Sequence, residues 1–403
     1  MKHNFRIVIG MLLFAIPLCI NAQVRPVKPK QEPQKPKVEK TEKDKEKEKA
    51  EKEKEKREKK EGKTKPFNSE MLKFSGFVQG MYQANLSDEG KLTGNTFRMR
   101  RVRLSAEGTL YKGLTYKIQG DFSRSPMLVD AFVKYKVADA FAIQLGQFKT
   151  PFSLESPINP VNLEIFDYGE GIQKLVGYSD VCGVGGLGRD IGLMATGSLF
   201  PIKGEEGIKY HVVDYAIGVF NGNGPTTTDN NNRKDLVGRL EVHPGLKALT
   251  LSGSYYYGKY TKDDNKNCDR KRWAAGVQYN DGNLVLRGEY LNGTTGYFNY
   301  IIDYNNNPIE QYQFSKGYYA VAGYNFKLGK EGKQTLMPVL RYEHFEPGDK
   351  MPEVLGSTNY YTVGINYWPL KSLNFKLDYS LVQQIIGEKT NSHRVVGILS
   401  YKF

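Results

Sequence analysis

Residues 393–403, HRVVGILSYKF, alternate between two kinds of side chain. One parity is apolar or aromatic and consists of Val395, Gly397, Leu399, Tyr401 and Phe403. The other parity holds Arg394, Ser400 and Lys402, with Val396 and Ile398 among them. Because successive side chains of a β-strand point to opposite faces, this period of two predicts a strand with two different environments.

The same alternation recurs upstream in segments of about ten residues, as in 114–122, 249–257 and 373–381. Short turns separate some of these segments, at 111–113, 138–140, 201–207, 244–248, 280–283, 327–334 and 369–372. Longer polar stretches separate others, including 149–188, 221–233, 260–269 and 291–314. About 16 strands with short turns at one rim and long loops at the other predict an all-β, antiparallel outer-membrane barrel.

A barrel also accounts for the closing strand, because an open sheet edge in hydrocarbon would leave backbone groups unpaired. We expect 393–403 to pair with the first strand, near LKFSGFVQGMY (72–82), with Leu399, Tyr401 and Phe403 facing lipid. Such a strand resembles the signal that barrel-assembly machinery reads. The alternative is the last strand of a soluble sandwich, which the repeated alternation and the expected export disfavour.

The first residues, MKHNFRIVIGMLLFAIPLCINAQ, combine Lys2 and Arg6 with an apolar run over 7–18 and a small residue before Gln23. This pattern predicts a signal peptide over 1–22, removed after Ala22. The apolar run is shorter than the roughly 20 residues of a membrane helix. In the exported chain Cys182 and Cys268 remain, which is too few for a disulfide framework.

Residues 23–66 are rich in Pro and then in Lys and Glu. Within 24–66 there are 18 basic and 11 acidic residues, so this segment holds half of the chain's net charge of +14. Such a composition cannot form a core and predicts a disordered periplasmic linker, with contact to the cell wall as a further hypothesis. The basic balance therefore does not indicate nucleic-acid binding by the barrel domain, 67–403.

Four stretches resemble the phosphate-selective porin O and P family: RMRRVRLSAEG (98–108), VDAFVKYKVADAFAIQLGQFKTPFSLE (129–155), GRDIGLMATG (188–197) and GVFNGNG (218–224). The resemblance implies a trimeric 16-strand porin whose third long loop folds into the pore. It identifies 149–188, with Phe152, Glu155 and Lys174, as the constriction loop.

The pore-lining candidates that attract anions are Arg100, Arg101, Arg103, Lys117, Lys134 and Lys149. Three guanidiniums within four residues repel one another unless an anion or carboxylates lie between them. The resemblance implies that the paired Arg100 and Arg101 attract anions. The loop, however, carries five carboxylates, Glu155, Glu164, Asp167, Glu170 and Asp180. We therefore expect a mild anion preference rather than a tight phosphate site.

The five histidines show neither metal-ligand spacing nor a catalytic triad, so we expect no metal, no cofactor and no enzyme. A passive porin for small solutes, anions among them, is the favoured function. It would lie in the bacterial outer membrane, among lipids and lipopolysaccharide. The alternative is an adhesive or structural barrel, with a plugged lumen and a tail that contacts the cell wall.

Overall fold

The computed structural model describes residues 70–182, 186–262, 266–294, 314–349 and 355–403. The chain divides into two units, 1–66 and 67–403. The expected signal peptide and linker belong to the first unit and lie outside the described residues. Among the described residues, no helix has the length and apolar character needed to cross a membrane.

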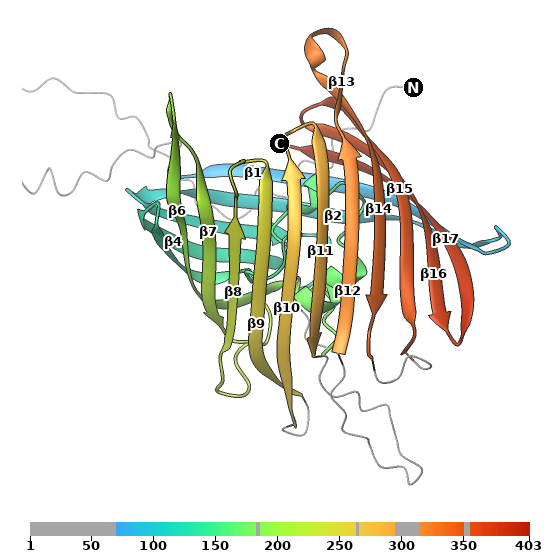
Figure 1. Ribbon diagram of the computed structural model, residues 1–403, viewed down its shortest axis with the longest axis horizontal. Coiled ribbons are helices and arrows are strands. Elements are labelled where there is room, and N and C mark those ends of the chain that lie inside the picture. Colours follow the sequence, from blue (N-terminus) through green and yellow to red (C-terminus); the bar gives the residue numbers. More distant parts are fainter. Residues whose placement is uncertain (1–69, 183–185, 263–265, 295–313, 350–354) are drawn as a thin grey trace, which may run out of the picture. The chain divides into compact units, whose positions relative to one another are not determined.

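Antiparallel strands make up the second unit (Figure 1). They are β1 (Lys73–Ser87), β2 (Leu92–Tyr111), β3 (Leu114–Asp121), β4 (Leu128–Ala138), β5 (Phe141–Lys149), β6 (Arg189–Gly204), β7 (Gly207–Phe220), β8 (Asp235–Val242), β9 (Leu249–Lys262), β10 (Lys266–Asn280), β11 (Leu284–Thr294), β12 (Phe314–Tyr324), β13 (Phe326–Leu328), β14 (Gln334–Glu346), β15 (Ser357–Leu370), β16 (Leu373–Ile386) and β17 (Glu388–Lys402). Three short helices are η1 (Pro160–Asn162), α2 (Glu170–Val176) and η3 (Lys330–Gly332).

The strands close into a ring because β17 pairs with β1. Lys402 lies opposite Phe77, and the backbone of Phe403 both donates to and accepts from Gly76 at 3.0 Å. The short β13 continues β12, and both pair with β14, so together they form one position of the wall. The result is a closed antiparallel 16-strand barrel, which confirms the fold predicted from the alternation.

Strands are joined alternately at two rims. The short-turn rim holds connections such as 112–113, 139–140, 205–206 and 371–372, and the opposite rim holds the long connections 150–188 and 221–234. One expected loop, 260–269, is wrong in its bounds. The ladder continues through it, with Tyr260 paired to Cys268, so β9 ends only at Lys262 and β10 begins at Lys266.

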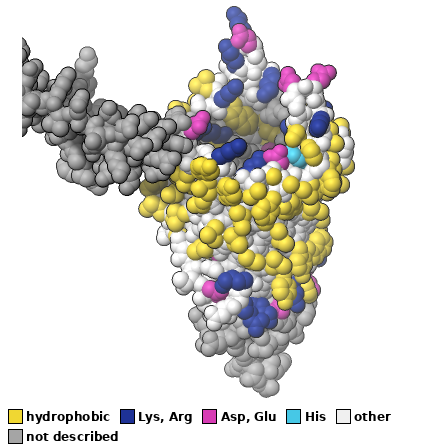
Figure 2. All heavy atoms as spheres, turned by 90° about the vertical axis from the view of Figure 1, so that its left-hand side faces the viewer, with side chains coloured by type: hydrophobic (Ala, Val, Ile, Leu, Met, Phe, Trp, Pro, Cys, Tyr) yellow, Lys and Arg dark blue, Asp and Glu magenta, His cyan; other side chains and the backbone are white. Residues whose placement is uncertain are grey.

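The two faces of the wall differ as a membrane barrel requires. On the face seen in Figure 2, a band of apolar side chains covers the outer surface, and charged side chains gather above and below the band. Leu399, Tyr401 and Phe403 are about half exposed on this surface, as predicted. Inward residues of the same region, including Gln79 and Ser400, are polar and buried and form a hydrogen bond of 3.0 Å. A soluble sandwich would need the reverse arrangement.

Candidate functional site

The constriction loop, predicted as 149–188, follows β5, which includes Lys149; its described residues, 150–182 and 186–188, fold into the barrel and form a core against the wall. Its apolar side chains Phe152, Leu163, Ile172 and Leu175 are almost completely buried. They belong to one cluster with wall residues of several strands, including Val237, Tyr256, Leu291, Tyr319 and Val339. The ring of Phe152 meets that of Tyr256 edge to face at 6.1 Å. Hydrophobic packing therefore holds the loop mainly to one side of the lumen, against β8–β14.

Buried ion pairs fix the loop to the same side. Glu155 accepts from Arg341 at 2.5 and 3.1 Å, and it lies 3.5 Å from Arg287. Arg287 also donates to Glu164 at 2.5 Å. All four side chains are at most one tenth exposed, so the carboxylates and guanidiniums pair with each other away from bulk water. Such pairs specify one position for the loop, because removing either partner leaves an uncompensated buried charge.

Asp180 forms a two-bond pair with Arg272 of β10, at 2.6 and 2.8 Å. Burial alone would raise the pKa of Asp180, but the guanidinium of Arg272 outweighs it and lowers the pKa below the usual range. The carboxylate is therefore charged at neutral pH. It anchors the chain just after α2, close to the end of the loop.

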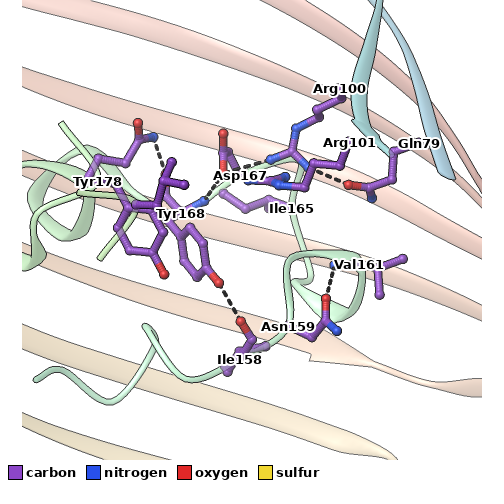
Figure 3. Close-up of polar contacts among 12 residues, drawn as sticks. Gln79, Arg100, Arg101, Ile158, Asn159, Val161, Ile165, Asp167, Tyr168 and Tyr178 are labelled. Carbon is purple, nitrogen blue, oxygen red and sulfur yellow. Dashed lines mark hydrogen bonds and ion pairs between the residues drawn. The ribbon is translucent and has the colours of Figure 1, made fainter. Parts of the chain in front are cut away.

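A β-bulge brings two adjacent arginines of β2 to the lumen. Gln79 of β1 lies opposite Arg101 and Gly80 opposite Met99, so Arg100 is an extra residue in β2. Both arginines are buried, and their Nη2 atoms lie 2.7 and 3.2 Å from Oδ1 of Asp167 (Figure 3). Arg100 also donates to Gln79 at 3.0 Å. A bulge inserts one extra residue into a strand. The side chain of Arg100 therefore points to the lumen, whereas strict alternation would point it outward.

Asp167 is the carboxylate that separates these two guanidiniums. Burial opposes its ionisation, but Arg100 and then Arg101 outweigh burial and hold its pKa well below the usual range. The third arginine of the stretch, Arg103, pairs with Asp121 of β3 at 3.0 Å. The crowded guanidiniums are thus held apart by carboxylates, one of which comes from the constriction loop.

Lys149 lies at the end of β5, where the constriction loop begins. Its ammonium group donates to the hydroxyl of Tyr168 at 3.0 Å and to the carbonyl of Ile158 at 3.2 Å, and also to the carbonyl of Ser156. These contacts tie the first part of the loop to its middle. Lys174, in the last turn of α2, is half-buried.

The remaining predicted cations lie on the other side of the lumen. Lys117 is 3.7 Å from Glu107, and both are partly exposed. Lys134 forms no ion pair with any side chain in the described part of the chain. A cavity of about 650 Å³ contains both lysines in its lining. A second cavity, of about 250 Å³, shares Lys117 with the first and is bordered by Asn159 of the loop. A third cavity, of about 350 Å³, shares Lys134 with the first.

These adjoining cavities define the open wall, the part of the inner face of β2–β8 toward the short-turn rim, which the loop leaves largely uncovered. The sequence-based candidates therefore fall into two groups. Separate contacts between loop and wall involve Arg100, Arg101, Phe152 and Glu155. Lys117 and Lys134 line the open wall instead.

A model of the phosphate-selective porin O and P family matches residues 73–283. The chain belongs to this family. The barrel is accordingly a passive channel of the bacterial outer membrane, and proteins of this fold are generally channels rather than enzymes.

Solved structures share the barrel at low sequence identity. They include the outer membrane channel DcaP of Acinetobacter baumannii (TM-score 0.56, 13% identity, covering 82% of this chain and 97% of that one). An anion-selective porin from Comamonas acidovorans has a TM-score of 0.56 and 14% identity, with coverage of 82% and 99%. Salmonella typhi OmpF has a TM-score of 0.57 and 16% identity, with coverage of 84% and 99%. These likenesses concern the fold alone. No curated protein matches the chain significantly.

One further lumen residue of this porin was not among the anion-attracting candidates chosen from the sequence. Arg394 of β17 lies over the ring of Phe166 at 4.4 Å and near that of Tyr360 at 5.6 Å. It forms no ion pair within the described ranges, although it lines a cavity of about 270 Å³ together with Asp167 and Glu170. The sequence signal for it was its inward parity on the closing strand, which does not by itself distinguish an unpaired cation from a paired one.

Proposed function

We propose that this porin conducts small solutes by passive diffusion and has a mild preference for anions. The observation that carries the proposal is the unequal charge compensation inside the barrel. The carboxylates of the loop engage Arg100, Arg101, Arg272, Arg287 and Arg341, so those charges largely cancel. Lys134 on the open wall has no such partner among the described residues, and Lys117 has a distant one.

Charges that are not compensated act on solutes in the adjoining cavities. A local excess of cationic groups in a narrow, wet channel raises the concentration of anions there. Lys117 and Lys134 supply that excess on the open wall. In this proposal Arg100, Arg101, Arg103 and Lys149 contribute positive potential but mainly position the loop.

A tight phosphate site is not part of this function. Phosphate recognition needs guanidiniums whose hydrogen-bond donors are free to grip the anion in pairs. Here Arg100 and Arg101 share Asp167, Arg103 already donates to Asp121, and all three side chains are buried, so they are not accessible to an anion in the lumen. The proposed substrate class is therefore small solutes in general, with anions favoured by potential rather than by a specific contact.

Liposome swelling tests the channel itself. Liposomes containing the folded porin should swell in isotonic solutions of small uncharged sugars, whereas liposomes with heat-denatured protein should not. The absence of swelling in any small solute would contradict the proposal. It would favour the plugged, adhesive barrel that contacts the cell wall through 24–66.

We further propose that 1–22 is removed on export, that 23–66 is a periplasmic linker and that the long loops of the barrel are external. The support is the sequence pattern and the usual topology of such barrels, with short periplasmic turns and longer external loops. Protease added to intact cells should leave 24–66 uncut. Cleavage there without rupture of the outer membrane would reverse the orientation.

The proposed assembly is a homotrimer, as the family resemblance implies. A further structural neighbour, OmpT of Vibrio cholerae, is described in a trimer form. Light scattering of the porin in detergent, corrected for bound detergent, should give three chains per particle. A monomer under all detergent conditions that preserve channel activity would contradict it.

A further inference from the structure

Side chains of the metal-ligand type meet on the inner face of the barrel near the short-turn rim. Asp214 of β7 lies opposite Glu241 of β8, and His243 follows two residues later, where its backbone N–H donates to Val212 at 2.8 Å. Residues two apart on a strand share a face, and directly opposed residues have Cβ atoms about 5 Å apart. The register therefore brings together three residues whose sequence spacing shows no metal motif.

The ligand atoms are close enough for one ion. One oxygen of each carboxylate and one ring nitrogen lie within 4.8 Å of one another. Tetrahedral Zn²⁺ at ligand distances of about 2.1 Å holds its ligand atoms about 3.4 Å apart. The side chains of His243, Asp214 and Glu241 are 16%, 39% and 21% exposed, so small rotations can close the difference.

We propose that Asp214, Glu241 and His243 form a binding site for a divalent transition-metal ion, with Zn²⁺ as the ion to test. Two carboxylates and an imidazole suit Zn²⁺, whereas Ca²⁺ and Mg²⁺ prefer oxygen ligands alone. Three protein ligands leave a fourth position open, and the adjoining cavity of about 350 Å³ gives that position access to the lumen.

The surroundings of His243 fit this role. Its Nδ1 lies 3.2 Å from the carbonyl oxygen of Leu249, and Nε2 lies 3.1 Å from Oδ2 of Asp214. A carbonyl only accepts, so if Nδ1–H donates to Leu249, the lone pair of Nε2 faces a carboxylate. A cation between the two acceptors removes that repulsion. Metal-bound histidines usually donate their other ring N–H to a carbonyl or carboxylate in this way.

The competing arrangement is an ordinary hydrogen bond without metal. The hydroxyl of Thr250 also lies 3.2 Å from Nδ1, so it can donate there while Nε2–H donates to Asp214. The hydroxyl of Ser198 contacts Oδ1 of Asp214, which leaves Oδ2 toward the ring in both arrangements. Metal binding distinguishes the two.

Neighbouring cations make the site weaker than a four-ligand structural site. Arg239 lies 3.2 Å from one oxygen of Glu241, which orients that carboxylate and leaves its other oxygen for a ligand bond. Lys134 and Lys136 line the same cavity. We therefore expect an exchangeable ion. When bound, it would offset two carboxylates of the open wall and increase the proposed anion preference.

The test is a calorimetric titration of the folded, detergent-solubilised porin, without a polyhistidine tag, with ZnCl₂. The wild-type chain should bind one Zn²⁺ per barrel. His243→Ala and Asp214→Asn should each weaken binding at least about tenfold. Loss of a residue that merely orients a metal ligand already costs about tenfold or more, so loss of a ligand should cost at least as much. His211→Ala is the matched control, because His211 lines the same cavity without belonging to the cluster. An excess of CaCl₂ should not displace the Zn²⁺.

Heat-dependent migration on gels confirms that each variant is folded, and Glu241→Gln replaces any variant that is not. Saturable binding that is lost in the cluster variants and kept in His211→Ala supports the site. The proposal is overturned if the wild type does not bind Zn²⁺ saturably, if the cluster variants bind as the wild type does, or if His211→Ala weakens binding as much as they do.

Discussion

Arg100 of β2 and Asp167 of the constriction loop lie 2.7 Å apart, between Nη2 and Oδ1. This pair exists because a bulge turns Arg100 to the lumen beside Arg101, which contacts the same oxygen at 3.2 Å. One loop carboxylate thereby compensates two wall arginines. The contact has two effects: it positions the loop, and it masks charge that would otherwise attract anions.

Replacing Asp167 with Asn should therefore increase anion selectivity. The amide keeps the shape of the side chain but leaves Arg100 and Arg101 without their carboxylate. The zero-current potential of single channels under a KCl gradient should shift toward the anion limit. Asp88→Asn is the control. The side chain of Asp88 is largely exposed, and the ion pair it forms is a long one of 3.9 Å with His393. An unchanged potential in Asp167→Asn would show that these arginines do not face permeating ions.

The same variant also gives a pH test. An ordinary aspartate has a pKa of about 3.9. Although burial opposes it, Arg100 and Arg101 hold the pKa of Asp167 well below that value, so its charge and its stabilising contribution persist at pH 4 and are lost only at lower pH. The difference in zero-current potential between wild type and Asp167→Asn should accordingly remain at pH 4. Convergence of the two between pH 7 and pH 5 would contradict the lowered pKa.

Glu155→Gln should loosen the loop without unfolding the barrel. Glu155 is fully buried and engages both Arg287 and Arg341. Removing one partner of a buried pair costs about 3–5 kcal/mol, because the other charge stays buried. Single-channel recordings should show larger and more variable conductance. Glu89→Gln, which breaks only the exposed pair with Lys91, should record as wild type. Steady wild-type conductance in Glu155→Gln would mean that the pairs do not hold the loop.

The wall was predictable from the sequence because each strand repeats a simple rule. Alternating side chains follow directly from the pleat, so the outward positions of Leu399 and Phe403 and the number of strands could be read from local pattern. The turn chemistry located the rims for the same reason.

The lumen was less predictable because it depends on contacts distant in sequence. Strict alternation sends Arg100 to the opposite face from Arg101, and nothing local marks the bulge opposite Gln79 and Gly80. The pairing of Asp180 with Arg272 requires knowing how the loop crosses the barrel. For this reason the sequence identified the charged candidates but not which of them are compensated.

Barrel closure can be tested with two glycines of β1. A Cβ atom added at Gly76 would lie 2.6 Å from ring carbon Cζ of Phe403 and 2.5 Å from the backbone oxygen of Arg103. At Gly80 no atom lies within 4 Å of such a Cβ. Gly76→Ala should reduce thermal stability and folded yield, since overpacking typically costs about 1–3 kcal/mol. Gly80→Ala should change neither. Equal behaviour of the two variants would show that Phe403 does not pack at the closing seam as described.

In the proposed function the barrel is an open channel whose mild anion preference comes from Lys117 and Lys134 of the open wall, which have at most one distant carboxylate partner among the described residues. The most direct measurement is the zero-current potential of single channels in planar bilayers under a KCl gradient, for wild type and for Lys117→Gln with Lys134→Gln. We expect discrete conductance steps and an anion-selective potential in the wild type. This zero-current potential should be smaller in the double variant. It should also decrease as the salt concentration rises, because the screening length is about 10 Å at 0.1 M and shortens with added salt. A barrel that conducts no ions, a cation-selective wild type, or a double variant with unchanged selectivity would contradict this function.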